Sequence, residues 1–291
     1  MRDQAESLRL KMLKTQGSLG RSIAVVSGKG GVGKSNFSTN FATTLANKGK
    51  KVVLVDMDIG MGNIHILMGK SASTSLRDYL QGNHSLDEVI FEGPSALQYI
   101  SGGSGMSSIL EWSEEMFERL IHAFEELQKN FDYIFFDMGA GITNWALDLL
   151  TSVDEIIVIS TAEPTSITDA YSMMKYIHLK DNDKQFYVLC NRIFSKEEGL
   201  ETLHRLKTTM KNFLGKDVIT LGSLPEDPVV RKAVREQVPF SIAFPDALIT
   251  KTLHLIVARF IEYRVEEIHA HEQTSNKFLS KLKSIFSKGR D

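Results

Sequence analysis

The chain has 291 residues, of which 42% are hydrophobic and 24% are charged, a composition typical of a globular protein. A formal net charge of −2 argues against a protein that binds nucleic acid over its whole surface, so no nucleic-acid partner is expected. The single cysteine, Cys190, excludes an internal disulfide and a cysteine-based zinc or iron–sulfur site within one chain. No run reaches the roughly 18 apolar residues of a membrane span, and the N-terminus is too polar for a signal peptide, so we expect a cytoplasmic protein.

The chain divides into three expected parts. Residues 1–20 form a polar segment that ends in a flexible linker, TQGSLG. Residues 21–268 alternate short apolar runs with amphipathic stretches and are expected to form one α/β domain. Residues 269–291 are first polar, then basic and amphipathic, which predicts a linker followed by a helix.

The N-terminal segment RDQAESLRLKML carries a weak helix signal. Asp3 and Glu6 make a D-x-x-E pattern that can cap a helix start, and Ala5, Leu8 and Met12 then share one face. So short a helix is unstable alone but can fold against a groove in a partner. A disordered tail with chance helical spacing is the alternative.

Several runs in the middle part are too apolar to have a face in water. Because they are rich in β-branched and aromatic residues, they are typical of strands buried on both faces. Their alternation with helical patterns predicts a mainly parallel, twisted sheet with helices on both faces, and such sheets bind ligands beyond the carboxyl ends of the strands. The runs are Ile23–Ser27, Val52–Asp56, Tyr133–Asp137, Glu155–Ser160 and Phe186–Asn191, and four of them end at or beside Gly28, Asp56, Asp137 and Asn191.

The sequence GKGGVGKS follows the first apolar run and precedes an expected helix over Ser35–Gly49. Glycines let backbone N–H groups wrap a phosphate without Cβ clashes, and the helix N-terminus adds partial positive charge. Lys34 can reach the β- and γ-phosphates, and the Ser35 hydroxyl can bind Mg²⁺. The residues expected to contact nucleotide here are Gly28, Lys29, Gly30, Gly31, Val32, Gly33, Lys34, Ser35 and Asn36.

Aspartates end two of the apolar runs expected at the same sheet edge. Asp56 and Asp58 lie in VVLVDMDIG, and Asp137 ends YIFFD. Carboxylates at this edge can assist Mg²⁺, usually through water, or orient an attacking water. A lone aspartate at a strand end is often only a cap, but three acids beside a phosphate loop favour a catalytic site. We assign Ser35, Asp56 and Asp137 to the expected Mg²⁺ site.

The motif KGGVGKS resembles the deviant phosphate loop of the MinD/ParA-type ATPases, which belong to the SIMIBI class of P-loop NTPases. Further matches in VVLVDMDIG, FDYIFFDMGAG, TAEPTSITDAY and NR extend the resemblance over most of residues 21–265. It implies a slow, Mg²⁺-dependent ATPase that forms a homodimer with ATP. In that family the early lysine, here Lys29, reaches the nucleotide of the partner subunit. The charges agree, because a second ammonium group beside Lys34 would be repelled, whereas across an interface it neutralises charge on the transferring phosphoryl group.

The same resemblance assigns the remaining roles in the site. Asp58 matches the residue that orients the hydrolytic water, and Asp137 matches the magnesium acid. The expected catalytic residues are therefore Lys29, Lys34, Asp58 and Asp137. Asn191 matches the adenine reader, and LPEDPVVRKAV matches a segment that packs on the base. The expected base contacts are Asn191, Arg192, Pro225, Glu226 and Asp227.

The C-terminal sequence NKFLSKLKSIFSKGRD predicts an amphipathic helix. Its apolar stripe consists of Phe278, Leu279, Leu282, Ile285 and Phe286, with Lys281 among the basic residues around it. A basic amphipathic helix of this kind is typical of one that lies on an anionic membrane, so reversible attachment to the inner face of the cell membrane is expected. A helix docked on its own domain is the alternative, and the two can be states of one segment.

The segment DQAESLR resembles the D-Q-A-x-x-L-R element of the FlhG group (also called FleN or YlxH), MinD-like ATPases that control flagellar number and placement. The matching residues are Asp3, Gln4, Ala5, Leu8 and Arg9. The resemblance implies that this segment binds the SRP-type GTPase FlhF and stimulates its GTP hydrolysis. It also implies contact with flagellar C-ring proteins.

Three other functions compete with this interpretation. A MinD-type division-site ATPase shares the core and a similar C-terminal helix, but would not need DQAESLR. A ParA-type partitioning ATPase would need a basic patch for DNA, and the clearest basic cluster here lies on an apolar-striped helix. A scaffold that binds nucleotide without hydrolysing it is disfavoured by Asp58.

Overall fold

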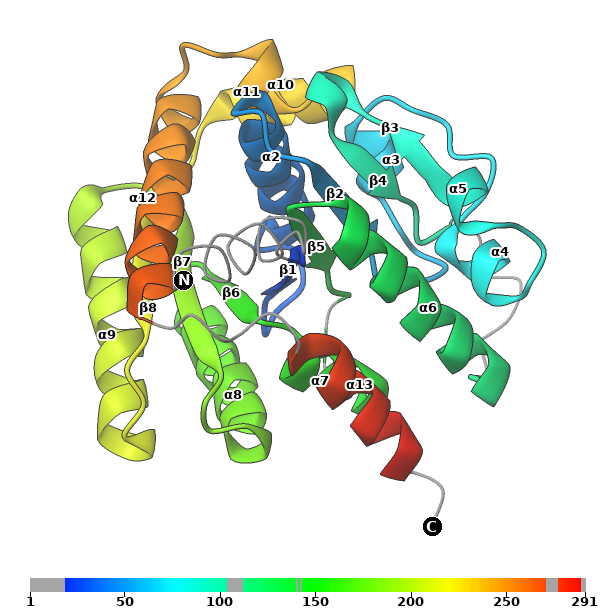
Figure 1. The fold of residues 1–291 in the computed structure, drawn as a ribbon. Coiled ribbons are helices and arrows are strands. Elements are labelled where there is room, and N and C mark those ends of the chain that lie inside the picture. Colours follow the sequence, from blue (N-terminus) through cyan, green and yellow to red (C-terminus); the bar gives the residue numbers. More distant parts are fainter. Residues whose placement is uncertain (1–18, 104–111, 140, 142, 271–276, 289–291) are drawn as a thin grey trace, which may run out of the picture.

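The computed structural model describes residues 19–103, 112–139, 141, 143–270 and 277–288. These residues form one eight-stranded sheet with helices on both faces (Figure 1). The residues expected to contact FlhF, namely Asp3, Gln4, Ala5, Leu8 and Arg9, lie outside the described residues.

The strand order in the sheet is β3-β4-β2-β5-β1-β6-β7-β8. All neighbouring strands run parallel except β3 and β4, which are antiparallel. The parallel arrangement places the ends of β1, β2, β5 and β7 at one edge, and Asp56 is directly opposite Asp137 in the β2–β5 register. The strands are β1 Arg21–Val26, β2 Val52–Asp56, β3 Ile90–Glu92, β4 Gln98–Ile100, β5 Tyr133–Asp137, β6 Glu155–Ser160, β7 Gln185–Ile193 and β8 Ile219–Pro225.

The helices form one layer on each face of the sheet (Figure 1). One core holds side chains of α4, α6, α7, α8, α9 and α13, for example Phe124 and Met173. The other holds side chains of α2, α11 and α12, for example Phe41 and Phe260. The helices are α2 Lys34–Asn47, α3 Ile64–Leu67, α4 Leu76–Leu80, α5 Leu86–Val89, the 3-10 helix η1 Pro94–Ala96, α6 Glu114–Asn130, α7 Asn144–Ser152, α8 Pro164–Lys180, α9 Lys196–Leu214, α10 Pro228–Glu236, α11 Phe240–Ala243, α12 Leu248–Ala270 and α13 Lys277–Lys288.

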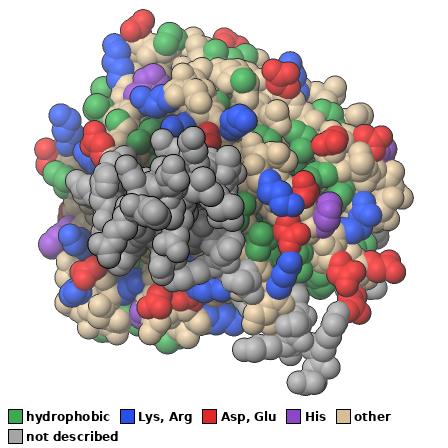
Figure 2. Space-filling model, viewed as in Figure 1, with side chains coloured by type: hydrophobic (Ala, Val, Ile, Leu, Met, Phe, Trp, Pro, Cys, Tyr) green, Lys and Arg blue, Asp and Glu red, His purple; other side chains and the backbone are tan. Residues whose placement is uncertain are grey.

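The five strands expected from apolar runs are all present, and their residues are almost entirely buried. This burial follows from the two helix layers, which leave the central strands no face in water. Side-chain colours in Figure 2 show acidic and basic groups interspersed over the visible surface, as expected for a nearly neutral chain.

The expected C-terminal helix, α13, packs against α6 and α7. Phe278 is 1% exposed and Leu282 is 0% exposed, and the Phe278 ring centroid lies 5.8 Å from that of Phe124 in α6. At the flanks, Lys281 pairs with Asp181 at 2.7 Å. Part of the stripe expected to face a membrane is thus buried in the core in this structure, which is the docked alternative. Among the described helices, none is both long and apolar enough to cross a membrane.

Candidate functional site

The phosphate loop connects β1 to the 14-residue helix α2. Gly33 occupies the N-cap position of α2 with φ +90°, a left-handed conformation that favours glycine. Because glycine has no side chain, no side-chain hydrogen bond caps the start of α2. Other helices are capped by hydroxyls, for example α6 by Ser113 and α7 by Thr143. The first N–H groups of α2 are therefore left without a side-chain cap and can bind an anion.

Lys34 and Asp137 meet at the carboxyl edge of the sheet. Lys34 Nζ donates to Asp137 Oδ1 over 3.2 Å, and the Ser38 hydroxyl donates to the same oxygen over 2.8 Å. Asp137 is 2% exposed. Ser38 was not among the expected site residues, although it lies one helical turn after Lys34 and so on the same face of α2. These hydrogen bonds hold Lys34, at the start of α2, beside Asp137, the expected magnesium acid at the end of β5.

Lys29 points toward a different element from Lys34. Its Nζ donates to Glu163 Oε2 over 2.7 Å and to Thr165 Oγ1 over 3.2 Å, both near the start of α8. The hydrogen bond and the charge of Lys29 lower the pKa of Glu163. Because Lys29 and Glu163 are 42% and 61% exposed at their side chains, this pair lies at the surface of the protein. Glu163 and Thr165 lie in TAEPTSITDAY, a stretch that matches the family, but no local pattern links them to Lys29.

Asp56 organises the loop that carries Asp58. Its two carboxylate oxygens accept the N–H groups of Asp58 at 3.1 Å and Ile64 at 3.2 Å. Burial, together with the negative charge of Asp137, raises the pKa of Asp56 to about 7. Asp56 is thus a buried carboxyl that positions the Asp58 loop and lies beside the expected magnesium acid.

A second glycine loop holds the Asp58 loop against the sheet. The N–H groups of Gly60 and Gly62 donate to the carbonyls of Gly102 and Gly103 over 3.0 Å each. A Cβ atom on Gly102 would lie 2.8 Å from the Asp58 carbonyl oxygen, so only glycine fits there without movement. On the other side, Asp58 Oδ1 lies 3.4 Å from where a Cβ atom of Gly139 would be. The expected water-orienting acid therefore faces the loop that follows Asp137.

The residues expected to contact the base border a cavity of about 260 Å³ beside the phosphate loop. Asn191 is 8% exposed, and its Nδ2 donates to the Val32 carbonyl over 2.8 Å, which ties β7 to the loop. A cavity between phosphate-binding glycines and several apolar side chains suits a nucleobase and sugar. The lining residues are Gly31, Gly33, Asn36, Phe37, Asn191, Arg192, Leu224, Pro225, Glu226, Asp227, Val230, Arg231, Phe240 and Ile249.

Charged groups form one wall of this cavity. Glu226 accepts from Arg192 Nε over 2.8 Å and from Arg231 over 3.5 Å. Arg192 has φ +61°, unusual for a residue with a side chain, which is typical of functional sites. Asp227 accepts the Val229 N–H over 3.0 Å and so caps α10. Arg231 belongs to LPEDPVVRKAV but was not among the expected base contacts, because nothing in that segment marks which of its charged residues borders the base.

The site fits a nucleotide with Mg²⁺. The uncapped start of α2 and its left-handed glycines form a cradle that side chains would fill, and Gly33 in particular could not carry a Cβ atom, which would lie 2.5 Å from Asn191 Nδ2. Within the described residues, no group of three or more His, Cys, Asp or Glu side chains is placed to hold a metal ion.

A family model described as ParA, NUBPL iron-transfer P-loop NTPase, matches residues 18–261. The iron chemistry in that description is not supported by the thiol of this chain. Cys190 is the single cysteine, it is buried, and burial raises its pKa to about 11, which disfavours the thiolate that binds metals.

Two relatives align with more than three quarters of this chain. The antiactivator FleN of Pseudomonas aeruginosa is 35% identical over 77% of this chain and 80% of its own. The flagellum site-determining protein YlxH of Helicobacter pylori is 33% identical over 82% of this chain and 81% of its own. The cell division ATPase MinD of Pyrococcus furiosus has the same fold, with a TM-score of 0.69 and 24% identity over 84% of this chain and all of that chain. The chain belongs to the MinD/ParA family of P-loop NTPases, in the group that contains FleN and YlxH.

Proposed function

We propose that this protein is an ATP-hydrolysing switch that dimerises around two nucleotides and regulates flagellar number and placement. The observation that carries the proposal is the two-lysine phosphate loop, in which Lys34 faces Asp137 while Lys29 lies at the surface, in a chain that matches FleN and YlxH. The name flagellum site-determining protein, carried by YlxH, supports the flagellar role, and the name antiactivator, carried by FleN, supports a regulatory role.

The proposed reaction is hydrolysis of ATP by an attacking water. Backbone N–H groups at the start of α2 and the Lys34 ammonium bind the β- and γ-phosphates. Asp58, held by Asp56 and the Gly102 loop, orients the water for attack on the γ-phosphorus. Ser35, Asp56 and Asp137 are the residues that would hold Mg²⁺, and the bound ion would neutralise phosphate charge; Asp56 and Asp137 lie opposite each other in the β2–β5 register.

The proposed dimer gives Lys29 its task. In the single chain its ammonium is bound by Glu163 and Thr165, at the same sheet edge as the phosphate loop. Because that pair is exposed, Lys29 can exchange Glu163 for the triphosphate of a second subunit without leaving a buried charge behind. There it stabilises charge that develops on the transferring phosphoryl group.

The proposed membrane attachment requires α13 to leave α6 and α7, the helices on which it is docked. Exposing Phe278 and Leu282 together costs about 3–6 kcal/mol, because each large apolar side chain contributes about 1.5–3 kcal/mol when fully buried. Insertion of the same side chains into a bilayer, with about 1 kcal/mol per lysine near anionic lipid, offsets this cost. One copy of α13 therefore binds marginally, and two copies on a dimer bind far better through effective concentration.

The proposed partners follow from the N-terminal motif. Asp3, Gln4, Ala5, Leu8 and Arg9 would bind an FlhF-type GTPase, and the Gln4 amide would orient an attacking water at the phosphates of its nucleotide. Flagellar C-ring proteins are the further partners that the resemblance to FlhG implies.

Flagellar counts in the host, combined with ATPase rates of purified protein, test the proposed function. A strain that lacks this protein should have an altered number or position of flagella, and the intact chain should restore the normal pattern. Lys34→Ala should abolish ATP binding and fail to restore it. Normal flagella in the deletion strain would contradict the flagellar role, and measurable ATP hydrolysis by Lys34→Ala would contradict the assigned site.

A further inference from the structure

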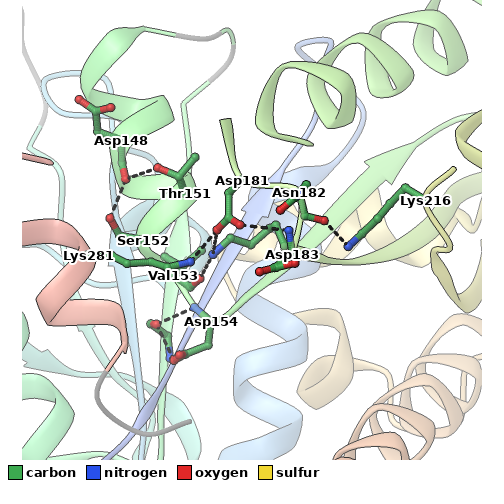
Figure 3. A network of polar contacts seen from close by, with 12 residues as sticks. Asp148, Thr151, Ser152, Val153, Asp154, Asp181, Asn182, Asp183, Lys216 and Lys281 are labelled. Atoms are coloured by element: carbon green, nitrogen blue, oxygen red, sulfur yellow. Dashed lines mark hydrogen bonds and ion pairs between the residues drawn. The ribbon is translucent and has the colours of Figure 1, made fainter. Parts of the chain in front are cut away.

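A network of charged groups joins α13 to the amino ends of the central strands, at the opposite edge from the phosphate loop (Figure 3). Lys281 of α13 reaches the loop between α8 and β7, where its Nζ lies 2.7 Å from Asp181 Oδ2. Lys184, from the same loop as Asp181, has its Nζ 3.7 Å from that oxygen. Two ammonium groups thus share one carboxylate oxygen when α13 is docked.

Lys184 is an unusual member of this network because it is buried. It is 5% exposed, and its ammonium donates to the Val153 carbonyl at the end of α7. Burial, together with the positive charge of Lys281, lowers the pKa of Lys184 to about 8. At neutral pH Lys184 therefore still carries its charge, in a place where that charge is poorly solvated.

The two carboxylates that attract Lys184, those of Asp181 and Asp154, are also bonded to other groups. Asp154 Oδ2 accepts the N–H group of Ser22 over 2.9 Å and its hydroxyl over 2.7 Å. Asp181 accepts the Asp183 N–H over 3.1 Å through its other oxygen, so both of its oxygens are engaged. The cavity at this junction has a volume of about 140 Å³, and its lining includes Lys184, Asp181 and Lys281.

We propose that Lys184 opposes the docking of α13 by competing with Lys281 for Asp181. Departure of α13 removes the charge of Lys281, opens the site to water and leaves Asp181 to Lys184 alone. In the docked state, burial of Phe278 and Leu282 holds α13 on the domain, whereas repulsion between Lys184 and Lys281 weakens the docking. This inference rests on the proposed membrane role, in which α13 must be released to an anionic lipid surface.

Hydrogen exchange of α13 in the full chain, without lipid at pH 7, tests the inference. Lys184→Met removes the competing charge and keeps most of the side chain's length, so exchange in α13 should slow, by about tenfold for each 1.4 kcal/mol of repulsion relieved. Asp181→Asn leaves two lysines without a carboxylate and should speed exchange. Lys180→Met is the matched control, because Lys180 pairs with Asp148 instead, 2.8 Å away, and exchange should not change.

Opposite effects of Lys184→Met and Asp181→Asn are the signature of competition. Faster or unchanged exchange in Lys184→Met would overturn the inference, because Lys184 would then support the seat or be neutral to it. Should Lys184→Met not fold, Lys184→Gln replaces it with the same expected direction.

Flotation with vesicles that contain phosphatidylglycerol separates this inference from the membrane role. Lys184→Met should lower the bound fraction in the presence of ATP, and Asp181→Asn should raise it. If no variant binds these vesicles although α13 exchange changes as expected, the membrane role fails and the role of Lys184 stands.

Discussion

Replacing Gly33 by alanine tests how the phosphate loop is built. Gly33 has φ +90°, and a Cβ atom there would lie 2.5 Å from Asn191 Nδ2. The left-handed backbone costs alanine about 1–2 kcal/mol. Moving Asn191 breaks its hydrogen bond to the Val32 carbonyl, at about 1–3 kcal/mol for a buried group left unpaired. We therefore expect Gly33→Ala to lower the free energy of unfolding by about 2–5 kcal/mol.

Gly49→Ala is the matched control, because Gly49 has φ +78° and nothing within 4 Å of its potential Cβ atom. It should cost only the backbone term, about 1–2 kcal/mol, and leave nucleotide affinity unchanged. Gly33→Ala should weaken affinity at least about tenfold, which corresponds to about 1.4 kcal/mol. Urea denaturation and titration with a fluorescent ATP analogue measure both quantities. Equal stability losses and equal affinities for the two variants would refute the proposed packing of Asn191 on the loop.

Further predictions concern the acids and the N-terminal segment. Because the folded pKa of Asp56 is about 7, ionisation on raising the pH penalises the folded state, so the stability advantage of Asp56→Asn should grow by about 2–3 kcal/mol from pH 5 to pH 8, as measured by urea denaturation in chelator. Asp58→Ala should retain ATP binding and lose hydrolysis, because the water is no longer oriented; a phosphate-release assay measures this. Removal of residues 1–20 should abolish stimulation of FlhF GTPase activity and leave ATPase activity intact.

Each of these predictions has a contradicting result. A pH-independent difference between wild type and Asp56→Asn would mean that this carboxyl does not titrate near neutrality. Wild-type phosphate release by Asp58→Ala would assign the water to another group. Full GTPase stimulation by the truncated chain would remove the basis for an N-terminal activator.

The central strands could be predicted from sequence because both of their faces are buried. In the run YIFFD the first four residues are aromatic or aliphatic, which indicates a buried strand, and Asp137 at its end marks the edge of the sheet where the site lies. β8 was not predicted because it lies at the sheet edge with several half-buried residues and a glycine, Gly222. The three-residue strands β3 and β4 are too short to carry a pattern.

The site was predicted where contacts are local and missed where they depend on the fold. The phosphate loop is a continuous motif, so Lys34 and its neighbours could be named directly. The partners of Lys29 lie more than 130 positions away, and no local pattern links them. For α13, the apolar stripe predicts a helix that buries one face. The stripe does not show what covers that face, because a membrane and a protein groove can each bury the same side chains. Only the three-dimensional structure shows that Phe278 packs beside Phe124 of α6.

The central claim is that ATP joins two copies of this chain through Lys29. The most direct measurement is sedimentation of Asp58→Ala with ATP and Mg²⁺, compared with the double variant that also carries Lys29→Ala. The proposal predicts a dimer for the first protein and a monomer for the second at equal concentration. A monomer for Asp58→Ala at every concentration, or an equally stable dimer without Lys29, would contradict it.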